Sequence, residues 1–169
     1  MRLSPLAFSL LPLAAAAHTL AAPPPAAPSD LPPGVAVVKA AAIADKIEHA
    51  PPSPGGRGGV IAQDEGYRVH VSERDVPGQA ELHDGDTDVW YVMAGGATVV
   101  MGGTIVDSSV SGTGEHRGPS IRGGTDLAIA AGDVITIRPG VAHWVKSVDG
   151  RLRYMVVKVH THPAPPGAK

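Results

Sequence analysis

The chain has 169 residues, no cysteine and a formal net charge of −2 at pH 7, and this length suits one domain once the two ends are set aside. The lack of cysteine excludes disulfides, thiolate metal ligands and a cysteine nucleophile. The basic residues are scattered, so the sequence shows no basic patch for nucleic acid, and we expect no nucleic-acid partner. Aromatic residues make up only 4% of the chain, so aliphatic side chains must fill most of the core.

The first residues are typical of an export signal. Arg2 supplies a positive charge, residues 6–17 are mostly apolar, and small residues suited to a signal peptidase follow. A membrane anchor is the alternative, but Pro12 interrupts the apolar run, which is shorter than the roughly 20 apolar residues of a membrane-spanning helix. We therefore expect a signal peptide over residues 1–22, a periplasmic or secreted protein, and no stable membrane insertion after cleavage.

Residues 23–59 are expected to join this signal to the main domain. Their first part is rich in alanine and proline, which is typical of a linker. Apolar residues then recur at helical spacing, which predicts a short helix from Ala40 to His49, and Pro51 and Pro52 end it. We expect the helix to pack against the main domain or against a neighbouring subunit, and we expect a flexible loop from Pro54 to Gly59.

Residues 60–160 are predicted to form β-structure. Short runs rich in β-branched residues, separated by glycine and other turn residues, predict strands at 66–73, 78–83, 88–93, 97–101, 104–106, 127–131, 133–137, 143–147 and 151–160. We expect a polar, glycine-rich loop from Ser108 to Ser120 and a flexible tail over residues 161–169. Many short strands at this spacing are typical of an all-β sandwich or barrel.

Three side chains of metal-ligand type lie near one predicted hairpin. Glu81 and His83 are two residues apart, so they point to the same face of an extended strand. The Asp-Gly-Asp-Thr segment that follows favours a turn, and Asp88 opens the next strand. A hairpin of this kind brings two carboxylates and an imidazole to one point, which suggests a metal site.

A second informative stretch runs from Gly132 to His143, with a Gly-Asp start and a Pro-Gly-x-x-His end. Together the two stretches resemble the two motifs of the cupin superfamily. In the first motif Glu81 and His83 stand in place of a His-x-His pair, and Asp88 stands in place of a glutamate. The resemblance implies an all-β fold, the cupin double-stranded β-helix or jelly-roll barrel, with a short N-terminal helix before it.

The resemblance also implies that Glu81, His83, Asp88 and His143 hold a divalent transition metal. Ligand sets that mix imidazole with carboxylate suit Mn, Fe, Zn, Ni or Cu. Glu81 is the ligand that we expect to detach and act as a catalytic base. The alternative is a hydrogen-bonded polar cluster without a metal, which a barrel interior can also hold.

Three further residues are candidates for substrate binding. Arg117 lies in an insertion over Ser108–Gly124 that the resemblance implies, where it would reach over the barrel mouth with His116 beside it for proton transfer. An exposed charged loop is the alternative for this pair. Arg138 is either a substrate clamp or a surface turn residue, and Trp90 either lines the pocket or fills the core.

The sequence leaves two classes of function open. One is a metal-dependent enzyme, a dioxygenase, isomerase or lyase, that acts on a small polar or anionic molecule. The other is a periplasmic module that binds a small molecule or a metal without turnover. Both take a small-molecule ligand, and the resemblance is compatible with a homodimer because cupins are often dimers. A fold shared by many activities does not decide between the two classes.

Overall fold

The computed structural model describes residues 31–53 and 56–161. In this part of the chain there is one helix, α1 (Ala40–Glu48). The strands are β1 (Arg57–Gln63), β2 (Tyr67–Arg74), β3 (Ala80–His83), β4 (Asp86–Met101), β5 (Thr104–Val106), β6 (Ser109–Gly112), β7 (Glu115–Gly118), β8 (Ser120–Arg122), β9 (Thr125–Ala130), β10 (Val134–Ile137) and β11 (His143–His160).

The predicted signal peptide over residues 1–22 lies outside the described residues, and so does the tail after residue 161. The periplasmic or secreted location and the homodimer therefore stay predictions. Within the described ranges, no helix is long and apolar enough to cross a membrane.

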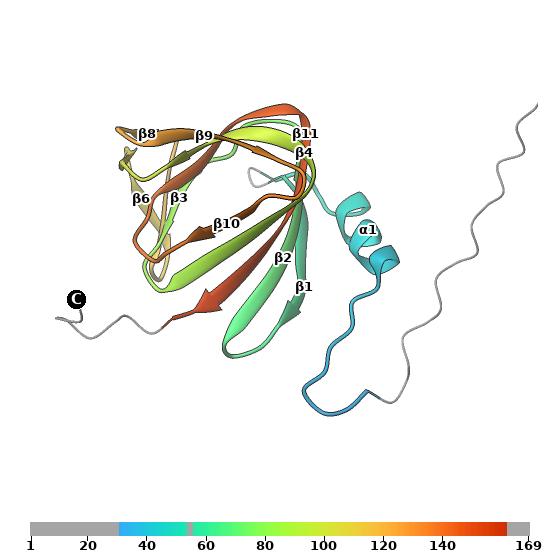
Figure 1. Ribbon diagram of the computed structural model, residues 1–169. Helices are drawn as coiled ribbons and strands as arrows, with labels where there is room; N and C mark the ends of the chain where they lie inside the picture. The colour runs from blue at the N-terminus through green and yellow to red at the C-terminus, as the bar shows by residue number, and fades with distance from the viewer. Residues whose placement is uncertain (1–30, 54–55, 162–169) are drawn as a thin grey trace, which may run out of the picture.

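A nine-stranded antiparallel sheet curls on itself to form the barrel (Figure 1). One path through the sheet runs β1-β2-β11-β3-β7-β6, and β4 pairs with β9, β10 and β11. β5 and β8 form a separate two-stranded sheet. The long strands β4 and β11 pair from Met101 opposite His143 to Asp86 opposite His160, so they connect the two ends of the barrel. The all-β prediction is confirmed.

The two long strands are bent, and each replaces a pair of predicted shorter strands. In β4 the bend falls at Gly95, whose φ is 77°. A Cβ at this position would collide with the carbonyl oxygen of Arg151 in β11, so only glycine fits there. In β11 the register with β4 shifts between Val148 and Leu152. Such bulges bend a strand without ending it, and glycine-rich segments therefore lie within long strands here.

Alternation along β4 and β11 builds the core. Trp90 and Val92 point inward and are 4% and 0% exposed, whereas Tyr91 and Met93 between and after them are 43% and 36% exposed. Burial of each large apolar side chain contributes about 1.5–3 kcal/mol. The core cluster consists of Trp90, Val92, Ala97, Val99, Ile129, Ile137, Val145, Leu152, Tyr154 and Val156. Asp88 precedes Trp90 by two residues and is buried on the same inner face.

The predicted loop from Ser108 to Ser120 is wrong. β6 and β7 form a hairpin there, and β7 pairs with β3 so that Glu115 lies opposite His83. The segment is polar and rich in glycine, and its strand structure comes from ladder hydrogen bonds to a distant strand rather than from local preference. The loop expected up to Gly59 is also wrong in part, because β1 begins at Arg57 and pairs with β2.

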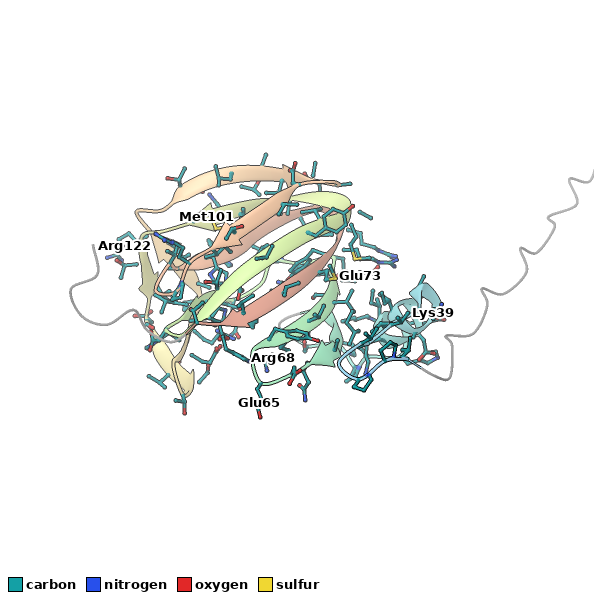
Figure 2. All side chains as sticks on the ribbon, turned by 60° about the horizontal axis from the view of Figure 1, so that its bottom comes forward. Lys39, Glu65, Arg68, Glu73, Met101 and Arg122 are labelled. Carbon is teal, nitrogen blue, oxygen red and sulfur yellow. The ribbon has the colours of Figure 1, made fainter. Side chains whose placement is uncertain are left out.

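The predicted helix is confirmed as α1, which ends one residue earlier than expected. It packs against β1 and β2 on the outside of the barrel, with Ile47 buried (Figure 1). Figure 2 shows Lys39, next to α1, at the opposite side of the molecule from Arg122 in β8. The helix is therefore remote from the β5–β8 side of the barrel.

Candidate metal centre

Strand pairing brings Glu81, His83, Asp88 and His143 together inside the barrel. Glu81 and His83 lie on β3, and His143, the first residue of β11, is the backbone partner of Glu81. β4 adds Asp88. His83, Asp88 and His143 are only 2–3% exposed, while the Glu81 side chain is 30% exposed. The predicted convergence of these residues is therefore observed, with Glu81 nearest to solvent.

The four side chains direct nitrogen and oxygen atoms at one small space. Glu81 Oε2 lies 3.6 Å from His83 Nε2 and 4.0 Å from His143 Nε2. Asp88 Oδ2 lies 3.6 and 3.7 Å from the same two nitrogens. One ligand atom from each of Glu81, His83 and His143 lies within 4.8 Å of the other two, and Asp88 is not part of this set. Two imidazoles and one carboxylate are thus close enough to share one ion.

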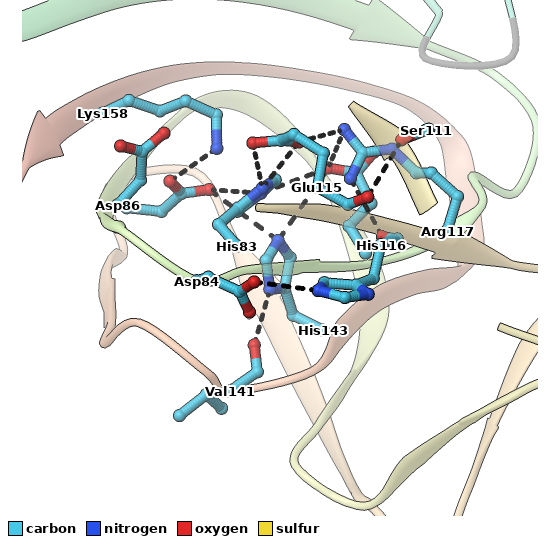
Figure 3. Close-up of polar contacts among 12 residues, drawn as sticks. His83, Asp84, Asp86, Ser111, Glu115, His116, Arg117, Val141, His143 and Lys158 are labelled. Atoms are coloured by element: carbon cyan, nitrogen blue, oxygen red, sulfur yellow. Dashed lines mark hydrogen bonds and ion pairs between the residues drawn. The ribbon is translucent and has the colours of Figure 1, made fainter. Parts of the chain in front are cut away.

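The outer nitrogen of each ring fixes how the ring is oriented. His143 Nδ1 lies 3.1 Å from the carbonyl oxygen of Val141, which only accepts hydrogen bonds, so Nδ1 carries the hydrogen. His83 Nδ1 lies 2.9 Å from both carboxylate oxygens of Glu115 (Figure 3), and it donates to them for the same reason. In the neutral rings this leaves the lone pair on Nε2, and both Nε2 atoms face the centre of the cluster.

The buried Nε2 atoms of His83 and His143 have no hydrogen-bond partner among the described residues. A buried polar atom without a partner costs about 1–3 kcal/mol, and such atoms are rare in native proteins. Here the lone pairs also face carboxylate oxygens, which only accept. A cation between them satisfies all of these atoms, and the imidazole and carboxylate donors suit a divalent transition metal.

The protonation states favour metal binding. Burial alone would raise the pKa of Glu81, but the close His83 ring and the charge of Arg117 outweigh it and lower the pKa to about 2. Burial lowers the pKa of His143 below its usual 6.5, against smaller opposing effects from Val141 and the carboxylates. Near neutral pH the carboxylate is therefore ionised and this imidazole is neutral, which are the forms that bind metals.

Glu115 and Arg117 extend the site toward the β6–β7 hairpin. Arg117 Nη2 lies 2.9 Å from Glu115 Oε2 and 3.7 Å from Glu81 Oε2. Arg117 is 24% exposed and lies on β7, so it is placed beside the centre by a strand and not by a flexible loop. A carboxylate that accepts from the outer nitrogen of a metal-binding histidine orients the ring and raises its basicity. Glu115 is in the right place to do this for His83.

Asp88 is engaged on the other side of the cluster. Its Oδ1 accepts a hydrogen bond from Lys158 Nζ at 2.8 Å, and its Oδ2 accepts one from Trp90 Nε1 at 3.4 Å. The Trp90 ring packs edge-on to His143, with ring centroids 5.6 Å apart, and against Tyr154 at 5.1 Å. Trp90 thus lines the core and also contacts the cluster, and Lys158 supplies a partly buried cation.

The structure does not bring Arg138 or His116 into the cluster. Arg138 is exposed after β10, and no hydrogen bond or ion pair joins it to the cluster in the described part of the chain. His116 lies opposite Leu82 in the β3–β7 ladder, on the other face of the strands from Glu115, and its Nε2 lies 3.0 Å from Asp84 Oδ2. His116 therefore pairs with Asp84 rather than with the cluster.

Sequence reasoning missed Glu115 and Lys158. Lys158 continues the inward row of Leu152, Tyr154 and Val156 at every second residue of β11, so the alternation of this strand contained a signal for it. Glu115 had no comparable local signal, because only the register of β7 against β3 places it beside His83.

No protein-family model matches the chain, and no curated protein matches it. Several solved structures are similar to the chain. The protein BH2720 from Bacillus halodurans is 15% identical, and the match covers 80% of this chain and 88% of that one with a TM-score of 0.52. A Klebsiella pneumoniae protein with a double-stranded β-helix domain is 18% identical over 69% of this chain and 88% of its own, with a TM-score of 0.48. A cupin protein from Bacteroides fragilis is 11% identical over 68% and 81%, with a TM-score of 0.43.

The chain is an antiparallel β-barrel, and its fold is similar to that of BH2720. At these identities the likeness concerns the fold alone, so any argument about function must come from the residues of this chain. A cavity of about 610 Å³ lies elsewhere on the barrel, between α1, β2 and β11, and its lining includes Ile47, Arg57, Glu73 and Arg151. None of the residues of the metal centre lines it.

Proposed function

We propose that this protein binds a divalent transition metal through Glu81, His83 and His143 and uses it as an enzyme on a small polar or anionic molecule. The observation that carries the proposal is the pair of buried Nε2 atoms, which face each other across the cluster without a hydrogen-bond partner among the described residues. Their rings are 5.1 Å apart between centroids, and both are held from behind through Nδ1.

The residues of the cluster and the neighbouring Arg117 have distinct parts in this proposal. A bound Mn, Fe, Zn, Ni or Cu ion would supply Lewis acidity toward oxygen atoms of a substrate. His83 and His143 hold the ion in an interior that excludes most water, and Glu81 offers its charge at the solvent side. Arg117, 3.7 Å from Glu81, is the cation best placed to attract an anionic substrate.

The low pKa of Glu81 bears on its predicted role as a catalytic base. A carboxylate with a pKa of about 2 is a weak base near neutral pH. The same low pKa keeps it ionised and available to a metal over almost the whole accessible pH range. The structure therefore favours Glu81 as a ligand over Glu81 as a base.

Metal analysis of purified protein tests the first half of the proposal. The protein is stripped with a chelator, incubated in turn with Mn, Fe, Zn, Ni and Cu, separated from free metal and analysed by mass spectrometry. We expect about one tightly held ion per chain for at least one metal, as the single cluster implies. A protein that retains none of them contradicts the proposal.

Turnover assays test the second half. The loaded protein is incubated in air with a panel of small carboxylic acids and enolisable compounds, and product formation is compared with that of His143→Ala. Turnover that requires His143 supports an enzyme. Binding of a panel compound without turnover, measured by calorimetry, would instead support the alternative of a non-catalytic binding module.

A further inference from the structure

The two carboxylates of the metal centre are held in different ways. Both oxygens of Asp88 accept hydrogen bonds, Oδ1 from Lys158 at 2.8 Å and Oδ2 from Trp90 at 3.4 Å. The cation nearest to Glu81 is Arg117, and their 3.7 Å separation is longer than a hydrogen bond. Lys158 therefore holds Asp88 through Oδ1, although Asp88 Oδ2 lies 3.6 and 3.7 Å from the two histidine Nε2 atoms. Glu81 has no such short contact with a cation.

The Lys158–Asp88 pair is built into the sheet. The two residues are direct partners in the β11–β4 ladder, so their side chains lie on the same face. Their side chains are only 13% and 3% exposed, and Figure 3 shows the Lys158 ammonium directed into the cluster. A largely buried charge pair of this kind is strongly held, because separating it leaves the buried Asp88 charge uncompensated.

We propose that Lys158 keeps Asp88 out of the ligand shell, so that an ion held by Glu81, His83 and His143 keeps positions open for a small carboxylate ligand. This inference rests on the metal-binding function proposed above. The set of mutually close donors agrees with it, since it contains Glu81 and both histidines but not Asp88. Lys158 is thus a positioning residue that acts through Asp88.

The charges around the centre select the class of ligand. The three carboxylates of Glu81, Asp88 and Glu115 face the two cations Lys158 and Arg117. Among these five side chains the carboxylates outnumber the cations by one, and a divalent ion would turn this balance into one net positive charge. A ligand with a single negative charge then neutralises a centre that is mostly buried, where unbalanced charge is costly. A monocarboxylate meets this requirement and offers oxygen to the ion.

Cobalt(II) is a suitable probe, because its visible absorption reports how many ligands surround the ion. The metal-free protein is titrated with Co(II), and acetate is then added to the loaded protein. We expect the spectrum of the wild-type protein to change saturably with acetate. In Lys158→Met the released Asp88 joins the ion, so the spectrum differs before acetate is added, Co(II) binds more tightly, and acetate affinity falls at least about tenfold, the range of effects seen for residues next to a metal shell.

Three variants serve as controls. Asp88→Asn should weaken Co(II) binding by no more than about tenfold, whereas Glu81→Gln should weaken it far more. Lys158→Met with Asp88→Asn removes both charges, which avoids an unpaired buried carboxylate and should restore the acetate response. Lys146→Met breaks another lysine–aspartate pair of the same strand, an exposed one with Asp126 at 2.7 Å, and should behave as wild type.

Several outcomes overturn the inference. If Asp88→Asn loses Co(II) as completely as Glu81→Gln, Asp88 is itself a ligand. If Lys158→Met lowers acetate affinity but leaves the Co(II) spectrum before acetate unchanged, Lys158 acts by charge alone. Both results leave the metal-binding function intact. A wild-type protein that binds no Co(II) and none of the other five ions contradicts that function as well.

Discussion

The ligand cluster and the β6–β7 hairpin contribute to one site from different parts of the sheet. Glu81 and His83 lie on β3, and His143 begins β11, where it pairs with Glu81. Glu115 and Arg117 lie on β7, next to the edge strand β6. In the proposed function, β3 and β11 supply the atoms that bind the ion, and the β6–β7 hairpin supplies Glu115 to orient His83 and Arg117 to attract an anion. A site of this kind therefore depends on residues that no metal-binding motif contains.

The largest loss of metal affinity should come from substitution of the two histidines on β3 and β11. His83→Ala and His143→Ala each remove a nitrogen that faces the centre, and we expect metal affinity to fall by more than the roughly 10–100-fold typical of residues outside the ligand shell. Chelator competition measures the affinity, and circular dichroism should show that the β-structure persists. Wild-type affinity in either variant would mean that the ion binds elsewhere.

A smaller loss of metal affinity should come from a substitution in the β6–β7 hairpin. Glu115→Ala leaves the ligands in place but frees the His83 ring, so we expect metal affinity to fall by about 10–100-fold. Nitrogen NMR of the metal-free protein should also show that His83 Nδ1 loses its fixed hydrogen, and Glu115→Gln should retain part of both effects.

The matched control for Glu115 is its neighbour His116. Its side chain lies on the other face of β7 and pairs with Asp84, so His116→Ala should change neither the metal affinity nor the NMR signals of His83. Equal effects of the two variants would show that the hairpin acts only through its general stability.

A comparison of one arginine inside the site with one outside it distinguishes attraction of the ligand from a general effect of surface charge on acetate affinity. Arg117→Ala removes a cation 3.7 Å from Glu81, and we expect the affinity of the metal-loaded protein for acetate to fall by up to about tenfold, or about 1.4 kcal/mol. Arg138→Ala removes an exposed cation from a turn and should leave acetate affinity unchanged. A larger effect for Arg138 would favour the clamp role that the sequence allowed.

The smallest effect concerns the pH dependence of stability. Burial lowers the pKa of His70 in β2 below its ordinary 6.5, and nearby Arg68 adds to this. The unfolded chain then takes up a proton more readily than the folded protein, so the free energy of unfolding should fall as the pH drops below about 6.5. Urea unfolding at pH 8 and pH 5 should show a smaller loss for His70→Gln than for wild type, while exposed His49→Gln should match wild type.

The residues of the cluster could be predicted because the evidence for them is local. Glu81 and His83 share a strand face by simple alternation, and the segment that ends at His143 has a recognisable turn and spacing. The class of fold followed from strand-like runs between turn residues. These inferences need no knowledge of which strands are neighbours.

The remaining features could not be predicted because they depend on pairing. Gly95 looks like a hairpin residue, yet it bends one continuous strand because β11 passes close to it. Glu115 lies in a polar segment that resembles a loop, and only its register opposite His83 reveals its contact. Lys158 is an intermediate case, since the alternation of β11 points it inward but only the structure shows that it meets Asp88.

Anomalous X-ray scattering from a crystal loaded with Zn or Mn tests the central claim most directly. We expect one strong peak at the absorption edge of the metal, within about 2.0–2.2 Å of Nε2 of His83, Nε2 of His143 and a carboxylate oxygen of Glu81. A peak only at histidines outside the cluster, such as His116 or His160, with the space between the two buried Nε2 atoms empty, would contradict a metal centre in this barrel.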